Sequence, residues 1–197
     1  MLKEHIKQFI SALESEPESG TAQLFKEEKE YAEKHGLTLC NLAEEDAKLR
    51  FADSYIERCD KETENMIRNE ASDFLEQPLV FLKKRKNEFI YLESKWFDIV
   101  HAESVSLEAD DVFGTYDVML GLKLQKKYDN KIREFLNSHL HSDEATFDLM
   151  FNSQEGMWDF NFALNYVDGF DENMSIGEAY QLIYKFLFTL LETIETE

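Results

Sequence analysis

Acidic and amide side chains alternate with apolar ones in three short segments of this sequence. Asp117, Asp148 and Asp159 each stand between two bulky apolar residues, and Asn161 continues the alternation that contains Asp159. Successive side chains of a β-strand point to opposite faces of the sheet, so this pattern predicts three strands that are each apolar on one face and polar on the other. We therefore expect these four residues to be binding residues on the polar face.

A four-residue hairpin loop at 153–156 would set the register between the second and third of these strands. Asp148 then lies opposite Asn161 and diagonal to Asp159, and diagonal neighbours are roughly 7–8 Å apart. If the first strand pairs alongside, Asp117 joins them. Such oxygens could bind a hard divalent cation, or one carboxylate with a raised pKa could act as an acid. A polar sheet face that keeps the protein soluble is the simpler interpretation, because no spacing fixes a ligand geometry.

A second acidic segment, 168–173, precedes the last predicted helix and contributes two further candidate binding residues, Asp168 and Asp171. It lacks the residue order and the trailing glutamate of an EF-hand calcium loop. Asp and Gly also satisfy the backbone of a turn without any ligand. We therefore expect a turn here and no calcium site.

Two histidines and two acids gather at the end of another predicted helix, at His139, His141, Asp143 and Glu144. Zinc needs at least three ligands in tetrahedral geometry, whereas residues two apart lie on different sides of a helix. A histidine in the last turn also interacts favourably with the helix dipole. This favours a structural role for the pair, and the sequence predicts no metal and no cofactor.

The motifs of several enzyme classes do not occur in the sequence. It contains no G-x-x-x-x-G-K-[ST], G-x-G-x-x-G, G-x-S-x-G or H-E-x-x-H, which are typical of nucleotide binding, serine hydrolysis and zinc proteolysis. Its histidines also lack the Glu-x-x-His spacing of carboxylate-bridged metal centres. The sequence therefore favours a binding protein over an enzyme.

The charge of the chain limits the partners that it can bind. Its 41 acidic residues outnumber 21 basic ones and give a formal net charge of −20. Residues 141–197 hold one basic residue, Lys185, against twelve acidic ones. A field of this sign repels nucleic acid and anionic membranes. It either serves solubility or attracts a basic protein, whose encounter it would speed.

The C-terminal part, 105–197, has the pattern of a β-α-β-β-α unit. A helix with an apolar stripe lies between the first two strands, and a longer one begins at Ser175, where Glu178 completes a capping box. The three strands place their large apolar residues on one face, which the last helix should cover. We expect Trp158 to be buried there, opposite Phe151.

The N-terminal part, 1–104, is predicted to be helical. Apolar residues recur at helical spacing from Leu2 onward, a second helix is capped by Thr21 and closed by Gly36, and a third begins near Asn41. Helical spacing then continues to Pro78 and again as far as residue 99, where a strand at 89–92 is the alternative.

These observations predict an α+β fold in which an N-terminal helical region, 1–104, packs with the C-terminal α+β unit, 105–197, in one compact globule. We expect a small mixed or antiparallel sheet of three to four strands. No apolar run approaches the ~20 residues of a membrane helix, and the N-terminal segment does not resemble a secretory signal. A cytoplasmic protein whose two cysteines, Cys40 and Cys59, are free thiols is therefore expected.

Three functional hypotheses follow from the residues. The first is an acidic binding or regulatory protein, for instance an immunity- or antitoxin-type inhibitor of a basic protein. The second is a small enzyme or a protein that binds a small molecule or metal through the carboxylates of the polar sheet face. The third is a structural protein that acts through self-association.

Overall fold

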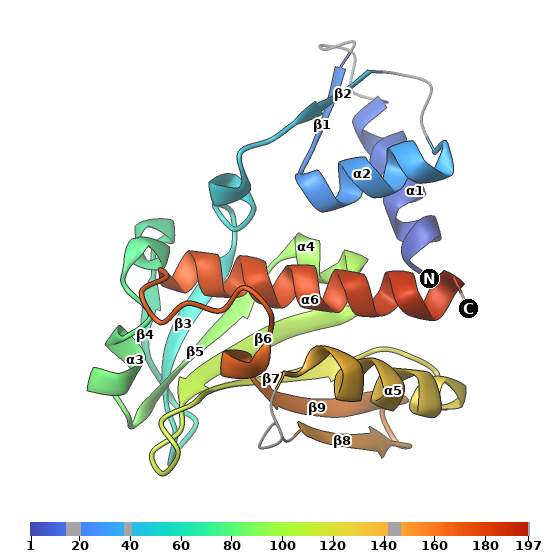
Figure 1. The fold of residues 1–197 in the computed structure, drawn as a ribbon. Coiled ribbons are helices and arrows are strands. Elements are labelled where there is room, and N and C mark those ends of the chain that lie inside the picture. Colours follow the sequence, from blue (N-terminus) through green and yellow to red (C-terminus); the bar gives the residue numbers. More distant parts are fainter. Residues whose placement is uncertain (15–20, 38–40, 142–146, 197) are drawn as a thin grey trace.

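In the computed structural model, residues 1–14, 21–37, 41–141 and 147–196 are described, and they form an α+β fold built on a large antiparallel sheet (Figure 1). The order of the seven strands across this sheet is β4-β3-β5-β6-β7-β9-β8. Their bounds are β3 (Tyr55–Asp60), β4 (Met66–Glu70), β5 (Glu88–Glu93), β6 (Ala102–Ala109), β7 (Tyr116–Leu122), β8 (Phe147–Asn152) and β9 (Met157–Ala163).

The helices and a small second sheet complete the fold. The α-helices are α1 (Leu2–Glu14), α2 (Lys26–His35), α3 (Phe81–Lys84), α4 (Lys95–Ile99), α5 (Asp129–His139) and α6 (Ile176–Thr196). Short 3₁₀ turns are η1 (Ala47–Leu49), η2 (Ser72–Glu76), η3 (Lys126–Tyr128) and η4 (Leu164–Tyr166). β1 (Thr21–Leu24) and β2 (Asn41–Glu44) pair in parallel and form the second sheet.

The size of the large sheet was predicted wrongly, since it has seven strands and not three to four. Of the further strands, β3 and β4 lie where the sequence suggested helices, β5 was given only as an alternative to a helix, and β6 was not recognised. Ile56 and Cys59 of β3 are three residues apart and both buried, although they lie on opposite faces of the sheet. Their spacing resembles that of a helix for this reason. β6 spans 102–109 and pairs with both β5 and β7, so the sheet continues across position 104.

Other N-terminal elements were predicted with mixed success. α1 and the left-handed Gly36 that ends α2 are confirmed, and so is the alternative of a strand at 89–92. The proposed helix start at Thr21 was wrong because 21–24 forms β1, and the helix proposed from Asn41 was wrong because 41–44 forms β2.

The C-terminal elements agree with the prediction in order and register. The four-residue loop places Asp148 opposite Asn161 and Phe151 opposite Trp158. Trp158 is 2% exposed, so its burial is confirmed. The capping box of α6 is also confirmed, because the backbone N–H of Ser175 donates to the Glu178 carboxylate at 2.7 Å.

α6 covers one face of the large sheet and forms the centre of the core. It runs across the strands with α5 beside it (Figure 1). The buried Tyr180 hydroxyl donates to the carbonyl of Ile90 at 3.0 Å, and the ring of Phe186 lies 4.9 Å from that of Phe162. α1 and α2 pack on α6 in turn, and one link is the hydrogen bond of 2.6 Å from the Tyr31 hydroxyl to Glu195. The opposite face of the sheet carries the side chains that form the candidate site.

Candidate binding surface

We call the face of the large sheet that α5 and α6 leave uncovered the open face. Buried and partly exposed residues alternate along the strands, and this alternation identifies the side chains that belong to it. Its outward side chains come from six strands and are Tyr55, Glu57, Cys59, Phe89, Tyr91, Glu93, Ser104, Ser106, Glu108, Asp117, Met119, Gly121, Asp148, Met150, Asn152, Asp159, Asn161 and Ala163. Six of these residues are acidic and none is Lys or Arg.

Most carboxylates of the open face lack a cation. Within the described part of the chain, only Glu108 among the six forms an ion pair, in which the Lys61 amine lies 3.1 Å from its carboxylate. Glu57 accepts hydrogen bonds from the Tyr55 hydroxyl and from the Cys59 thiol. Asp117 accepts one from the Thr115 hydroxyl at 2.9 Å. Neutral side chains thus donate hydrogen bonds to Glu57 and Asp117, and the negative charge of the face remains largely uncompensated.

Two of the acids directly oppose each other. Glu108 of β6 and Asp117 of β7 are register partners. Partial burial raises the pKa of both carboxyls. The charges of Asp117 and Asp110 raise the pKa of Glu108 further, and the charge of Asp110 raises that of Asp117, although Lys61 lowers both. Like charges directly opposite each other destabilise a sheet. This pair therefore has a cost in folding stability.

One hollow on the open face surrounds Cys59, and we call it the Cys59 hollow. It has a volume of about 490 Å³, and its lining includes Glu57, Phe89, Tyr91 and Glu108. Burial raises the pKa of the Cys59 thiol to about 11, so the group is protonated at neutral pH and is a poor nucleophile. Cys59 is a free cysteine, as expected, but lies in a strand and not on a helix; Cys40 lies outside the described residues.

A second hollow lies across Met119 from the first, and we call it the Asp148 hollow. Its volume is about 760 Å³, and Asp117, Asp148 and Asn161 line it together. The structure thus brings three of the predicted binding residues into one concave site. Asp159 lies on the same open face, where it pairs with Gly121 and Met150.

The other two predicted binding residues, Asp168 and Asp171, lie in the turn before α6 and not on the strands of the open face. The Asp171 carboxylate accepts a hydrogen bond of 2.9 Å from the backbone N–H of Asn173. This bond and a second one from the Asn173 side chain lower the pKa of Asp171. Asp171 borders a separate hollow with Glu27 and Lys185. The carboxylate therefore has the turn-stabilising role that the sequence suggests.

The histidine pair at the end of α5 is also accounted for by local contacts. The ring of His139 stacks on Phe135 with centroids 3.9 Å apart, and its Nδ1 lies 3.0 Å from the Phe135 carbonyl. His141 is exposed, and Asp143 and Glu144 lie outside the described residues. In the described ranges, no group of three or more His, Cys, Asp or Glu side chains is placed to hold a metal ion.

Sequence reasoning missed the parts of the open face that β3 and β6 contribute, and it gave β5 only as an alternative to a helix. Glu57, Tyr91 and Glu108 are the main polar groups of these strands. The alternation of Ser106 and Glu108 with buried Leu107 was the signal that could have identified β6. β3 offered a weaker signal because its two buried residues belong to opposite faces.

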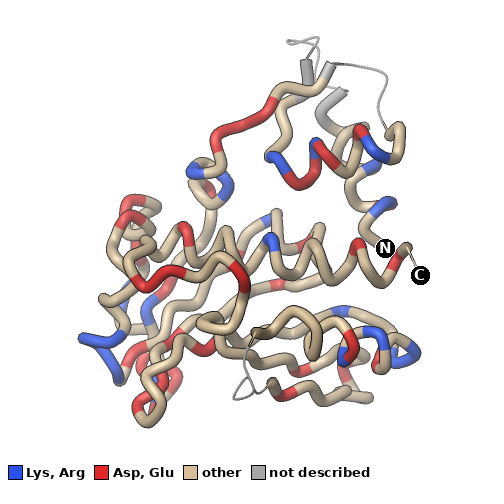
Figure 2. The backbone as a smooth tube through the Cα atoms, in the orientation of Figure 1, with Lys and Arg blue, Asp and Glu red and all other residues tan. Residues whose placement is uncertain are grey.

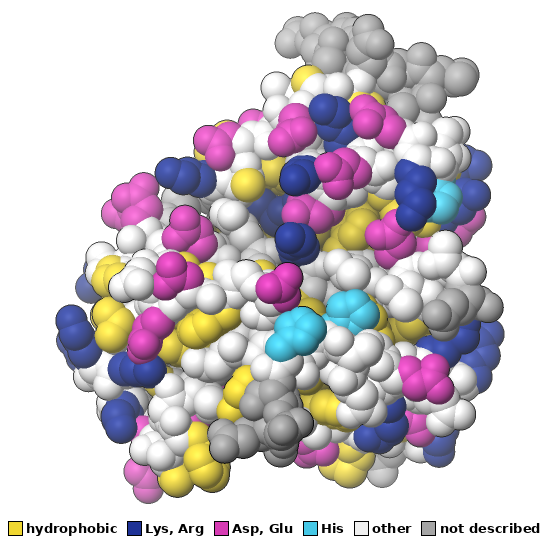
Figure 3. All heavy atoms as spheres, in the orientation of Figure 1, with side chains coloured by type: hydrophobic (Ala, Val, Ile, Leu, Met, Phe, Trp, Pro, Cys, Tyr) yellow, Lys and Arg dark blue, Asp and Glu magenta, His cyan; other side chains and the backbone are white. Residues whose placement is uncertain are grey.

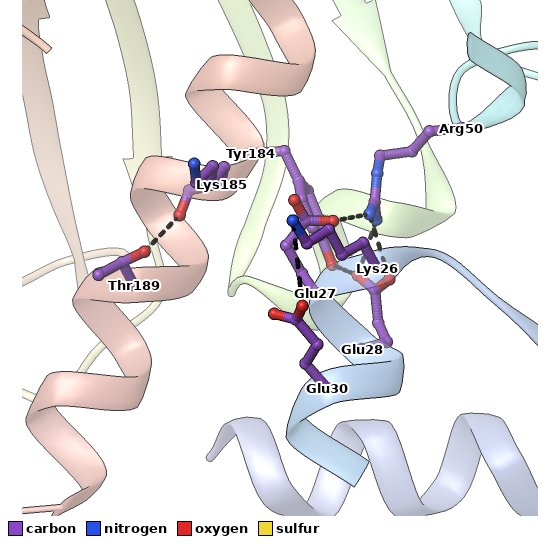
Figure 4. A network of polar contacts seen from close by, with 8 residues as sticks. All are labelled: Lys26, Glu27, Glu28, Glu30, Arg50, Tyr184, Lys185 and Thr189. Carbon is purple, nitrogen blue, oxygen red and sulfur yellow. Dashed lines mark hydrogen bonds and ion pairs between the residues drawn. The ribbon is translucent and has the colours of Figure 1, made fainter. Parts of the chain in front are cut away.

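A second charged cluster lies on the helix-covered side and differs in kind (Figure 4). The Arg50 guanidinium donates to Glu28 at 2.7 Å and to Glu27 at 2.6 Å, and the Tyr184 hydroxyl donates to Glu28. Burial disfavours the charge of Arg50, but the carboxylates outweigh this and raise its pKa. The guanidinium also lies over the rings of Phe25 and Tyr184, at 4.3 and 4.0 Å from their centroids. Here one guanidinium contacts both carboxylates, so the cluster joins α2, α6 and the segment after β2 structurally.

The distribution of charge differs between elements. Figure 2 shows Lys and Arg at α3 and around α5, and also on α1, α2 and the strands β3 and β4. Arg58 of β3 belongs to the helix-covered face, because it pairs with the buried Ile90. On the helix-covered side, Figure 3 shows acidic and basic side chains interspersed. No helix among the described residues is long and apolar enough to cross a membrane.

In comparisons with protein families, with curated proteins and with solved structures, nothing matches this chain.

Proposed function

We propose that this protein binds a basic segment of a partner protein on its open face. The observation that supports this most directly is that five of six carboxylates on the face have no ion-pair partner among the described residues. Aromatic side chains stand between them, notably Tyr55, Phe89 and Tyr91. Carboxylates and aromatic rings together suit lysine and arginine, because the first provide charge-assisted hydrogen bonds and the second cation–π contacts.

The net charge of −20 supports a protein partner over a nucleic acid or an anionic membrane. A field of this kind accelerates encounter with a basic protein. An immunity- or antitoxin-type inhibitor is the most concrete form of this function, since such a protein would cover the cationic site of a toxin or nuclease with its acids.

A second candidate function is the binding of a small cationic molecule in the Asp148 hollow. The volume of about 760 Å³ and the presence of Asp110, Asp117 and Asp148 in its lining favour it. The two functions differ in their dependence on salt. Long-range attraction of a basic protein is screened by ions, whereas a ligand enclosed among a few carboxylates depends on single residues.

A pair of variants with equal change in charge tests the proposal. The face variant combines Asp117→Asn, Asp148→Asn and Asp159→Asn, and the control variant combines three substitutions at exposed acids elsewhere. The control substitutions are Asp53→Asn, Glu76→Gln and Glu134→Gln. Each protein is used to capture partners from the native host, with carbodiimide cross-linking to join carboxylates to lysines in direct contact.

We expect the parent and the control variant to capture the same basic protein, with cross-links to open-face carboxylates. With that partner purified, the face variant should lower the association rate constant by about tenfold or more, and the rate constant of the parent should fall as salt rises. Equal effects of both variants, an association rate that salt does not change, or no captured protein would contradict the proposal. Loss of function by one substitution alone, at any salt concentration, would favour the small ligand.

A further inference from the structure

The loop between β6 and β7, residues 110–115, presents the two most exposed large apolar side chains of the described chain. Val112 is 80% exposed and Phe113 is 84% exposed. Together they form an exposed apolar tip on this hairpin, directly after the acidic residues Asp110 and Asp111. Exposed apolar groups that are held side by side are typical of interaction sites.

The shape of this loop does not depend on those two side chains. The Asp110 carboxylate accepts hydrogen bonds from the backbone N–H groups of Val112 and Phe113, the first at 2.7 Å. The backbone N–H of Asp110 donates to the carbonyl of Thr115 at 2.8 Å. Gly114 has a φ of 67°, which a residue with a side chain adopts only with strain. Polar groups and a glycine therefore build the turn, and folding does not explain the apolar tip.

The tip borders the Asp148 hollow. Phe113, Phe147 and Tyr166 belong to the lining of this hollow, together with Asp117 and Asp148. Apolar and acidic groups are thus combined in one concave site. A bound segment that satisfied only the charges would leave these rings in water.

We infer that the hairpin tip and the Asp148 hollow bind an amphipathic basic segment of the partner. An apolar side chain of that segment packs on Val112 and Phe113, and lysine or arginine residues beside it meet Asp117 and Asp148. This inference rests on the proposed function and adds the requirement for an apolar residue between cations. A second copy of this chain is disfavoured as the occupant, because it would bring another net charge of −20 to an acidic surface.

Two synthetic peptides of equal charge test this inference with fluorescence anisotropy at low salt. Both contain alternating lysine and serine, and in one of them two central serines are replaced by leucine. We expect the leucine peptide to bind the parent protein about tenfold more tightly, as the burial of one aliphatic side chain implies. The variant that combines Val112→Ser and Phe113→Ser should bind both peptides equally, with the affinity that the parent has for the serine peptide. Phe113→Leu should keep the preference.

The outcomes separate the two proposals. If the parent binds both peptides with equal affinity, the inference is overturned while the proposed function stands. If it binds neither peptide, the proposed function fails as well. Sedimentation of the parent and of the double serine variant tests whether a second copy of this chain binds the tip. A dimer that only the parent forms would show that it does and would overturn the inference. Unchanged unfolding midpoints in urea would show that the variants remain folded.

Discussion

The two sides of the large sheet differ in whether their charged side chains have partners of opposite charge. On the side of α6, each buried charged residue of the described chain lies within 4 Å of an opposite charge, as in the pairs of Arg50 with Glu28 and of Arg58 with Glu88. On the open face, five of six carboxylates have no such partner among the described residues. A charge that the fold itself compensates serves the fold, whereas one left uncompensated is available to another molecule.

The largest effect expected from this comparison is on the helix-covered side. Arg50→Met should lower the free energy of unfolding by about 3–5 kcal/mol, because the buried Glu28 carboxylate would lose its counter-charge. Lys26→Met is the matched control on the same helix as Glu28, since its ion pair with Glu30 is exposed and should contribute less than about 0.5 kcal/mol. Urea unfolding measures both.

A double variant sharpens this test. Arg50→Met combined with Glu28→Met removes both charges, so it should be more stable than Arg50→Met alone. If the single variant were as stable as the parent, the cluster would not be the structural joint that its contacts suggest.

The sequence predicts a strand reliably where apolar and polar residues alternate regularly along it. β7, β8 and β9 alternate strictly, so the register of Asp148 with Asn161 and the burial of Trp158 followed from the residues alone. Edge strand β4 has no buried position and therefore no pattern that could reveal it. β5 and β6 do alternate, but the apolar residues at 89, 92, 96 and 99 also fit helical spacing. β5 was therefore given only as the alternative, and β6 was not recognised.

The candidate site was predicted in part for the same reason. Asp117, Asp148 and Asn161 share one hollow because their strands are neighbours in the sheet, which the alternation and one hairpin indicated. Glu108 could be placed beside Asp117 only once β6 was known. Arg50 could not be predicted at all, since its partners on α2 and α6 are distant in the sequence.

A smaller effect is expected from His101, a partly buried histidine that contacts α1, and it depends on pH. The His101 ring stacks on His5 with centroids 4.5 Å apart. Burial, with the nearby charges of His5, the N-terminus and Lys123, lowers the pKa of His101 to about 4. The unfolded chain binds this proton near pH 6.5 and the folded one only near pH 4, so the free energy of unfolding should fall as pH drops between these values.

His101→Asn should flatten this pH dependence. Asparagine tolerates the positive φ of 59° at this position and does not titrate. Urea unfolding at several pH values between 7 and 4 measures the effect, and His139→Asn is the control at a partly exposed histidine. An equally steep loss of stability in the His101→Asn variant would show that other groups govern the response to acid.

The smallest expected effect has the opposite sign and lies on the open face. Asp117→Asn removes one of two directly opposed carboxylates and leaves the Glu108–Lys61 ion pair intact. It should raise the free energy of unfolding by about 0.2–1 kcal/mol at pH 7. Because the pKa of Asp117 is raised in the folded state, this advantage should vanish as pH falls and the carboxyl of the parent takes up its proton.

The control is Asp159→Asn, which should change stability little because Asp159 faces Gly121 and Met150. A gain in stability from Asp117→Asn, together with weaker binding of basic peptides, is the combination expected of an acid that is kept for binding rather than for folding. A loss of stability would instead assign Asp117 to the fold and remove the distinction between the two faces at this position.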